Sequence, residues 1–320
     1  RITSVLTSND GVQWDRDAAY TYYKHGPLAT MQLGDMQVQG IQYAYSIQGW
    51  LKAINADVLH PDADMGHDGQ TSPLMPKDVF AHALDYHQDD YRAISTAGFM
   101  KGTAANPLSQ SLYNGNIARQ TTAIHGLTNM QRTYQYDQLN RLLSAGYTEL
   151  DNNAPYEATA VPNDGYANSY SYDADGNIIS LLRKDGAGTT FDQLQYHYQA
   201  TTNNKLDYVD DQVPARIGGD LDLGPGQSSG NYVYDASGNL VKDVQGGLEE
   251  ISWNAMGKVD VIRNPDAGQY ISFYYDGMGQ RVRKDVLTED DNGDGDLLSD
   301  LYTRDAQGNI LAVYKRKAKV

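Results

Sequence analysis

The chain has 320 residues, of which 40% are hydrophobic, and 41 Asp and Glu outnumber 25 Lys and Arg to give a formal net charge of −16. Such an acidic surface repels phosphate groups, so the composition argues against nucleic-acid binding. Cysteine is absent, which excludes disulfides, zinc–thiolate sites and a cysteine nucleophile. The apolar runs are too short to predict a membrane span.

A nine-residue phrase recurs along the chain, as YSYDADGNI at 170–178 and YVYDASGNL at 232–240. Its irregular spacing favours hairpins with variable connections over a strict solenoid. The further copies, in chain order, are YTYYKHGPL (20–28), YAYSIQGWL (43–51), the shortened LYNGNI (112–117), YQYDQLNRL (134–142), YHYQATTNNKL (196–206), ISWNAMGKV (251–259), YYDGMGQRV (274–282) and YTRDAQGNI (302–310).

The phrase predicts a strand, a turn and a second strand. Tyr170 and Tyr172, two residues apart, fall on one face of a strand. The Asp173 side chain accepts a hydrogen bond from a backbone N–H two residues on, and Gly176 permits a positive φ. Ile178 then begins the next strand. Because the phrase occurs so often, we interpret its Asp residues as turn formers rather than ligands.

Residues 55–110 interrupt the series, and 55–76 predict a long polar surface loop. The following stretch favours a hairpin, with a first strand, a turn at 87–90 and a second strand at 91–94. A short helix stays an alternative, because Val79, Ala83 and Tyr86 also fit helical spacing. The alternation that favours the first strand is carried by Phe80, His82, Leu84 and Tyr86.

The loop at 60–69 is a weak metal-site candidate. Its carboxylates suit calcium, and its two imidazoles suit a transition metal. The alternative is an ordinary solvated loop. The potential ligands are His60, Asp62, Asp64, His67 and Asp68.

A stronger candidate for a calcium site is EDDNGDGDLLSD at 289–300. Oxygen ligands at alternate positions followed by Gly295 match the front half of an EF-hand-like loop. Leu301 stands where a bidentate acid is usual, and Asp300, one residue earlier, is the candidate to substitute for it. The alternative is a solvated acidic hairpin tip between strands at 273–287 and 301–314. The candidate ligands are Asp290, Asn292, Asp294, Asp296 and Asp300.

The phrases YSYDADGNI, YVYDASGNL and YYDGMGQRV resemble the YD repeats of the Rhs/YD-repeat family, which includes bacterial Rhs polymorphic toxins, the C subunits of insecticidal toxin complexes and the teneurins. The resemblance covers about 20–55 and 111–315. HGPLATMQLG, VQGIQYAYSIQGWLKAIN and LYNGNIARQ look like the large Rhs-type proteins of Bacteroidetes. The resemblance implies an all-β fold in which antiparallel hairpins form a sheet that spirals into a shell or barrel.

The same resemblance implies a non-catalytic segment of a large secreted or cell-surface protein. The shell would enclose or present a C-terminal cargo, such as a toxin domain, and its partners would be the rest of its own polypeptide and a secretion route such as type IX. The family's self-cleavage motif is not found in this segment. Sequences typical of metalloproteases, serine hydrolases and phosphate-binding loops are also missing, so we predict no enzyme.

A carbohydrate-binding or adhesion module is the alternative function, because tyrosine-rich sheets stack on sugar rings and acidic loops bind calcium. The first residues, RITSVLTSNDG, and the basic last residues, LAVYKRKAKV, lead us to expect a piece of a larger polypeptide. Within it, 1–320 is predicted to be one continuous repeat region that carries the insertion at 55–110.

Overall fold

The computed structural model describes residues 1–67, 76–92, 108, 110–150, 158–159, 164–201, 204–213, 226–289 and 295–319. In these residues the chain is all-β apart from one 3₁₀ turn, η1 (Pro61–Ala63). The antiparallel hairpin architecture predicted from the repeats is confirmed. The described part of the chain contains no helix long and apolar enough to cross a membrane.

The chain divides into two compact units. Unit 1 comprises Arg1–Ser171 and Leu182–Phe191, and unit 2 comprises Tyr172–Leu181 and Asp192–Val320. Strand β12 (Ile178–Lys184) therefore contributes residues to both units.

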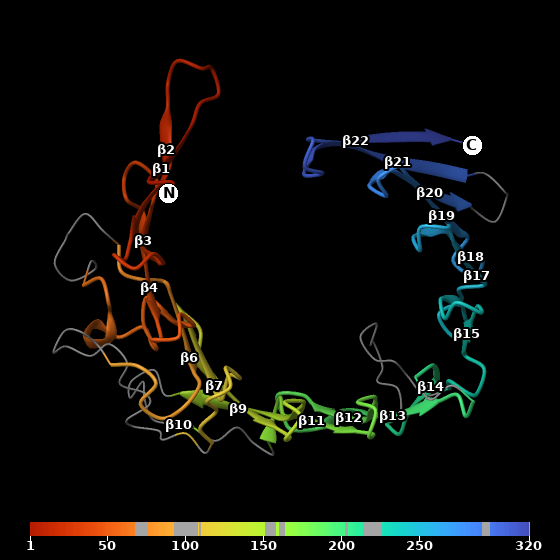
Figure 1. Ribbon diagram of the computed structural model, residues 1–320, viewed down its shortest axis with the longest axis horizontal. Coiled ribbons are helices and arrows are strands. Elements are labelled where there is room, and N and C mark those ends of the chain that lie inside the picture. Colours follow the sequence, from red (N-terminus) through yellow and green to blue (C-terminus); the bar gives the residue numbers. More distant parts are fainter. Residues whose placement is uncertain are drawn as a thin grey trace. The chain divides into compact units, whose positions relative to one another are not determined.

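In unit 1 the strands follow one another in a sheet in chain order (Figure 1), and each pairs antiparallel with the next from β1 to β9. Two further strands, β10 and β11, both pair with β9. The strands are β1 (Ser4–Thr7), β2 (Asp15–Tyr22), β3 (Leu28–Leu33), β4 (Gln39–Tyr45), β5 (Leu51–Ile54), β6 (Phe80–Asp85), β7 (Arg119–Ile124), β8 (Asn129–Tyr136), β9 (Leu142–Leu150), β10 (Ala158–Thr159) and β11 (Asn168–Tyr172).

Strand β6 comes from the insertion and completes the sheet between two repeats. It pairs with β7 along its whole length, and Ala83 faces Ala53 of β5. The strand and the turn after it were predicted, but the partners were not, because the expected hairpin placed the second strand immediately after the turn. Tyr91 and Arg92 lie outside any strand, and residues 93–94 lie outside the described residues.

In unit 2, β13 pairs with β14, β15 pairs with β16, and β17 to β22 form a six-stranded antiparallel sheet in chain order. The strands are β13 (Thr190–Tyr198), β14 (Leu206–Asp211), β15 (Tyr232–Tyr234), β16 (Leu240–Asp243), β17 (Glu250–Trp253), β18 (Val259–Asn264), β19 (Gln269–Tyr275), β20 (Arg281–Glu289), β21 (Gly295–Arg304) and β22 (Ile310–Lys319).

The main hydrophobic cluster of unit 1 lies where the first part of the insertion, residues 56–63, packs against β6, β7 and β9. Its side chains are small, which lets the insertion approach the sheet closely. Such packing is typical of a second layer laid over one face of a sheet. The cluster consists of Ala56, Val58, Ala63, Ala81, Ala123 and Leu150, with Leu59 packed against it.

The six-stranded sheet of unit 2 carries an aliphatic row across five strands. Direct cross-strand partners share a sheet face, so the row is continuous. Only Ile251 in it is buried, at 7% exposure, whereas Leu298 at the far end is 39% exposed. The sheet thus owes its order to cross-strand pairs and turns more than to a deep core. The row runs Ile251, Ile262, Ile271, Val286 and Leu298.

Candidate functional site

The repeated Asp closes its turn through both carboxylate oxygens. In the copy at Asp173, Oδ1 accepts from the Asn177 backbone N–H at 2.8 Å and Oδ2 accepts from the Asn177 side-chain amide at 2.8 Å. Gly176 has φ 93°, and its N–H donates to the Asp173 carbonyl. The copies at Asp235 and Asp305 repeat these bonds within about 0.1 Å. The turn prediction is confirmed, and the amide clamp explains why Asn follows Gly.

The clamp favours the ionised carboxylate. In Asp173, Asp235 and Asp305 the side-chain hydrogen bond from the Asn four residues on is the largest cause that lowers the pKa below its usual value. Backbone N–H donors lower it further, because hydrogen bonds to the charged form stabilise that form. These carboxylates are therefore already occupied by the turn and are poor ligands for a metal.

A second set of bonds links several repeats to the preceding one. The second aromatic of a repeat donates a hydrogen bond to the backbone carbonyl of the residue that follows the turn of the repeat before it. We call this series the repeat ladder. Members of the ladder include Tyr136 to Ile117 (3.1 Å), Tyr198 to Ile178 (2.8 Å), Trp253 to Leu240 (2.8 Å) and Tyr275 to Val259 (2.8 Å).

Arg304 takes the aromatic's place in the last repeat, YTRDAQGNI. Its Nη2 donates to the Arg281 carbonyl at 3.2 Å, and Arg281 follows the preceding turn as the other acceptors do. Its Nη1 also donates to the Gly308 carbonyl of its own turn at 2.8 Å. The guanidinium thus preserves the ladder where the sequence departs from the pattern. Sequence reasoning missed the ladder, although the recurrence of the second aromatic in most copies was its signal.

A buried ionic cluster fixes the insertion to the sheet in unit 1. Lys52 of β5 is 1% exposed, and its Nζ lies 2.5 Å from Asp85 Oδ1 and 2.7 Å from Asp90 Oδ1. Arg119 Nε of β7 lies 2.6 Å from Asp85 Oδ2. The other oxygen of Asp90 accepts from the Tyr86 N–H at 2.8 Å. Two cations balance two carboxylates, so the cluster is neutral.

Asp85 stays charged in this cluster despite its burial. Burial is the largest influence and raises its pKa, but the attraction of Lys52 and Arg119 and their hydrogen bonds together lower it below the usual value. A buried carboxylate is stable only with such compensation. The charged groups of the cluster are therefore paired with one another, and their role is to hold the insertion against the sheet.

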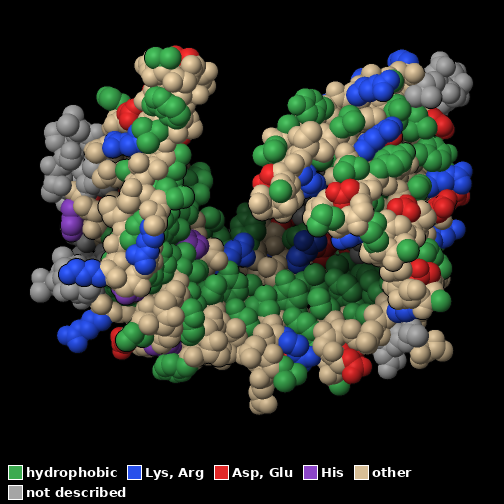
Figure 2. All heavy atoms as spheres, turned by 45° about the horizontal axis from the view of Figure 1, so that its top comes forward, with side chains coloured by type: hydrophobic (Ala, Val, Ile, Leu, Met, Phe, Trp, Pro, Cys, Tyr) green, Lys and Arg blue, Asp and Glu red, His purple; other side chains and the backbone are tan. Residues whose placement is uncertain are grey.

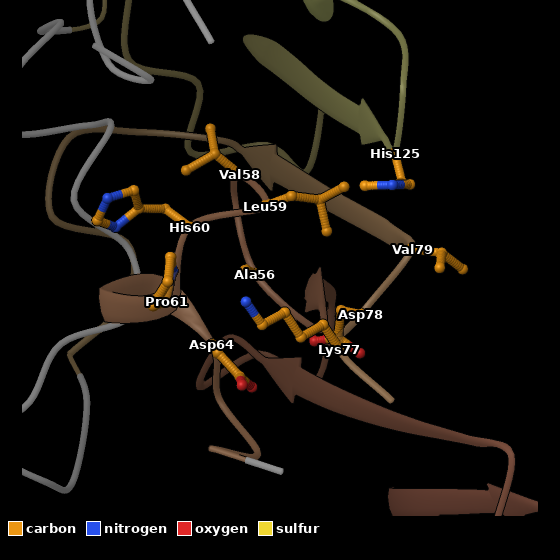
Figure 3. A pocket seen from close by; sticks show the side chains of 10 residues that line it. All are labelled: Ala56, Val58, Leu59, His60, Pro61, Asp64, Lys77, Asp78, Val79 and His125. Atoms are coloured by element: carbon orange, nitrogen blue, oxygen red, sulfur yellow. The ribbon is translucent and has the colours of Figure 1, made fainter. Parts of the chain in front are cut away.

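A pocket of about 400 Å³ lies in unit 1 between residues 56–64 of the insertion, residues 77–79 and the turn after β7 (Figure 3). Ala56, Val58 and Leu59 make its wall apolar, and Lys77 extends across it toward the segment 56–64 (Figure 3). The remaining residues around it are His60, Pro61, Asp64, Asp78, Val79 and His125.

The predicted ligands at 60–69 are only partly brought together. Asp64 Oδ1 accepts from the N–H groups of Gly66 (2.9 Å) and His67 (3.0 Å), so it closes a local turn. The Asp62 side chain and Asp68 lie outside the described part of the chain. Among described residues there is no group of three or more His, Asp or Glu that could hold a metal ion.

Of the predicted calcium ligands, two lie within strand β21 rather than in a loop. Asp296 binds Lys317 Nζ at 3.1 Å and Lys319 Nζ at 2.8 Å. Asp300 binds Lys284 Nζ at 3.0 Å. The other three, Asp290, Asn292 and Asp294, lie outside the described residues, and the calcium site stays a prediction.

A shallow groove of about 410 Å³ lies over β18 and β19 in unit 2. Tyr274 is 45% exposed there, beside Phe273 and Tyr275. The Asn254 amide donates to Asp260 Oδ1 at 2.9 Å, which places an amide and a carboxylate next to the rings. Aromatic rings beside such polar groups are the usual lining of a site for small polar ligands.

Comparison with known proteins supports the fold. No protein-family model matches the chain, and no curated protein matches it. The crystal structure of TcdB2-TccC3 without its hypervariable C-terminal region is similar over 98% of this chain, with TM-score 0.53 and 16% identity. The chain spans only 14% of that structure's length. This likeness shows an Rhs-like all-β fold.

Two related structures give weaker similarity. The Photorhabdus luminescens Tc holotoxin pore with the TccC3-D651A mutation matches over 97% of this chain, with TM-score 0.41 and 10% identity, and covers 16% of that chain. A second crystal structure of TcdB2-TccC3 matches over 96% of this chain, with TM-score 0.43 and 11% identity, and covers 17% of that chain.

Proposed function

We propose that the chain is a non-catalytic structural segment of a β-sheet shell in a larger Rhs-type protein, and that the shell encloses or presents a C-terminal cargo domain. The observation that carries the proposal is the repeat ladder. A functional site shared by all copies would place a reactive group at each repeat. Instead, the shared residues in the described copies are used to close turns and to join one repeat to the next.

The repeat ladder is suited to the thin wall of a β-sheet shell. A wall that faces solvent on one side and a hollow on the other cannot rely on a thick core, so its strands need bonds that run across the repeats. In three of the described copies a tyrosine hydroxyl supplies this bond in a part-buried position, where a phenol keeps its ring packed and its hydroxyl paired. The net charge of −16 keeps such an extended surface soluble.

The partners in this proposal are the remaining parts of the same polypeptide and the export machinery. Secretion to the outside or to the cell surface, with type IX as the candidate route, follows from the shell role and from the Bacteroidetes-like phrases. The absence of cysteine is compatible with that destination.

Protease protection tests the shell. The full-length polypeptide that contains this chain is digested under native conditions, and peptides from the cargo are followed by mass spectrometry. We expect the cargo to resist digestion until the shell unfolds, and to lose protection at lower denaturant in a Tyr198→Phe, Tyr275→Phe double variant. A Tyr314→Phe variant is the control, because Tyr314 is 62% exposed and outside the ladder. Cargo digested equally fast with and without the shell would refute enclosure.

A glycan-binding surface is the second candidate, favoured by the groove with Tyr274 over β18 and β19. Its test is a glycan array probed with the intact chain, in calcium and in chelator. Binding that is lost in Tyr274→Ala supports this groove, and binding that is lost in chelator supports calcium at 289–300. A blank array under both conditions removes the candidate and leaves the shell proposal untouched.

A further inference from the structure

Lys52 of β5 is a cation in a place where cations are rare. Figure 2 shows many Lys and Arg side chains at the molecular surface, where water stabilises their charge. Lys52 is 1% exposed and is the bulkiest of the side chains with less than 2% exposure in the described residues. A buried ion pair is often less stable than neutral groups of similar size. The site therefore favours a reaction that removes the charge of Lys52 together with that of a carboxylate.

The Lys52 ammonium group contacts two buried carboxylates that are held differently. Its Nζ donates to Asp85 Oδ1 at 2.5 Å and lies 2.7 Å from Asp90 Oδ1. The second oxygen of Asp85 accepts from Arg119 Nε at 2.6 Å, so a guanidinium stabilises the charge of Asp85. The second oxygen of Asp90 accepts from the Tyr86 backbone N–H at 2.8 Å. Because this donor is neutral, Asp90 is the carboxylate that can lose its charge to Lys52.

These contacts assemble the groups that amide formation needs. The Lys52 nitrogen is the nucleophile, and it touches the carboxyl group of Asp90, whose carbon Cγ is the electrophile. Attack on Cγ places negative charge on Asp90 Oδ2, to which the Tyr86 N–H already donates, as in an oxyanion hole. Asp85 contacts the same nitrogen and stays ionised beside Arg119, so it is placed to accept a proton from that nitrogen.

We propose that Lys52 and Asp90 condense into an intramolecular isopeptide bond. The ammonium group passes one proton to Asp90 Oδ1, and the resulting amine attacks Cγ of the neutral acid. A second proton moves from the nitrogen through Asp85 Oδ1 to Asp90 Oδ1, the bond between Cγ and Oδ1 breaks, and that oxygen leaves as water. The product is an amide between Nζ and Cγ. One ammonium and one carboxylate are consumed, one water is formed, and no co-reactant is needed.

Proximity and burial both favour the amide over the two ions. Groups held in a reactive geometry behave as if their effective concentration were about 10⁵ M or more. The side chains of Lys52 and Asp90 are 1% and 4% exposed, so they are shielded from the water that would hydrolyse the bond. Condensation also removes one buried cation and one buried anion, and it leaves Asp85 balanced by Arg119.

The bond joins β5 to the turn after β6 and closes residues 52–90 into a covalent loop. This loop holds the first part of the insertion. As with a disulfide, such a cross-link stabilises the fold mainly by restricting the unfolded chain. The reaction happens once in each chain and is not turnover, and the proposal does not rest on the shell role.

Intact mass spectrometry of the denatured full chain tests the bond directly. We expect a mass lower than the sequence mass by one water molecule. Trypsin requires a free Lys side chain, so the Lys52–Ala53 bond should resist cleavage even in the unfolded chain. The digest should contain a branched product in which residues 25–77 are joined to residues 78–92, with fragment ions that place the link between Lys52 and Asp90.

Three variants assign the roles. Asp90→Asn keeps the carbon that is attacked, so it should lose ammonia in place of water. Asp85→Asn keeps the size of the side chain but not its basicity, and in a time course after cell-free synthesis it should slow the loss of water about 100-fold. Asp89→Asn is the matched control, because Asp89 is an exposed neighbour in the same turn, and it should lose water as the unaltered chain does.

The full sequence mass in the unaltered chain, or tryptic cleavage after Lys52, would overturn the proposal and leave the cluster as ion pairs. Water lost from a linear peptide, as when an Asp–Gly pair cyclises, would place the reaction elsewhere and overturn it too. A link to Asp85, or unchanged loss of water in Asp90→Asn, would refute Asp90 as the electrophile. None of these results depends on whether a cargo is protected from proteases.

Discussion

The Tyr275 hydroxyl donates to the Val259 carbonyl at 2.8 Å, and this bond joins the turn region of one repeat to that of the repeat before it. Tyr275 sits at a register shift of the β19–β20 pair, directly before the turn. The shift inserts an extra residue in one strand and bends it locally. The Tyr275 hydroxyl therefore makes its hydrogen bond to the preceding repeat at the position where the β19–β20 hairpin is irregular.

Tyr275→Phe should lower the free energy of unfolding of unit 2 by about 1 kcal/mol, because it removes one hydrogen bond and leaves a carbonyl without its donor. Urea unfolding followed by Trp253 fluorescence measures the change, since Trp253 belongs to the same sheet. Tyr314→Phe is the control and should stay within about 0.5 kcal/mol. Equal effects of the two variants would show that the ladder bond contributes nothing.

Arg304 tests whether the ladder depends on the donor or on the aromatic ring. Arg304→Tyr should keep the stability of unit 2 within about 0.5 kcal/mol, because tyrosine supplies the donor used by the other repeats. Arg304→Met should cost about 1 to 2 kcal/mol, since it leaves the Arg281 and Gly308 carbonyls without this partner. If tyrosine proves as harmful as methionine, Arg304 acts through its charge or its packing on Tyr302.

Gly238 tests the turn. Its φ of 89° is unfavourable for a side chain, whereas space is not limiting, because an added Cβ would meet only the Lys205 Cε at 3.7 Å. Gly238→Ala should cost about 1 to 2 kcal/mol by backbone strain. Gly238→Asn should cost less, as Asn140 holds the same turn position with φ 63°. Thermal unfolding of both variants ranks them, and the reverse order contradicts this account.

Lys52→Met should destabilise unit 1 by about 3 to 5 kcal/mol, because it leaves the carboxylates of Asp85 and Asp90 buried with only Arg119 as a cation. Trp50 fluorescence reports the transition, since its ring lies 5.0 Å from the Tyr86 ring beside the cluster. Lys258→Met is the exposed control. A loss no larger than in the control would mean that the cluster is not a structural anchor.

The carboxylates of the repeated turns, at Asp173, Asp235 and Asp305, should make the stability of the folded chain sensitive to acid. Their pKa values are lowered on folding, so they stabilise the folded state above the unfolded pKa of about 3.9, and this contribution is lost as the pH falls through the folded pKa. Replacing Asp173, Asp235 and Asp305 by Asn should narrow the difference in Tm between about pH 6 and pH 3. An unchanged difference would place the acid sensitivity elsewhere.

The repeats made the fold predictable, because each Asp-x-x-Gly places a turn between two strands whatever lies farther along the chain. Residues that act locally, such as Asp173 and Gly176, were therefore interpreted correctly. The turn at Asp185, which has the same backbone bonds to Thr189, was missed because its strand lacks the paired tyrosines.

The buried cluster could not be predicted, since Lys52 and Arg119 meet only after β6 enters the sheet between them. Asp296 and Asp300 were misplaced for a related reason. Their acidic neighbours suggested a loop, but their spacing of four also fits one face of a strand, and the lysines that pair with them lie on other strands.

The backbone nature of the ladder's acceptors affects how the sequences of the repeats can diverge. Its donors bind carbonyl oxygens, which every amino acid provides, and the acceptor residues are accordingly Ile117, Ile178, Leu240, Val259 and Arg281. A mutation of the acceptor residue therefore leaves the hydrogen bond between the two repeats intact. The sequences of neighbouring repeats can therefore change independently, because a substitution in one repeat needs no compensating substitution in the other. A repeat can also be gained or lost without a compensating substitution in its neighbour.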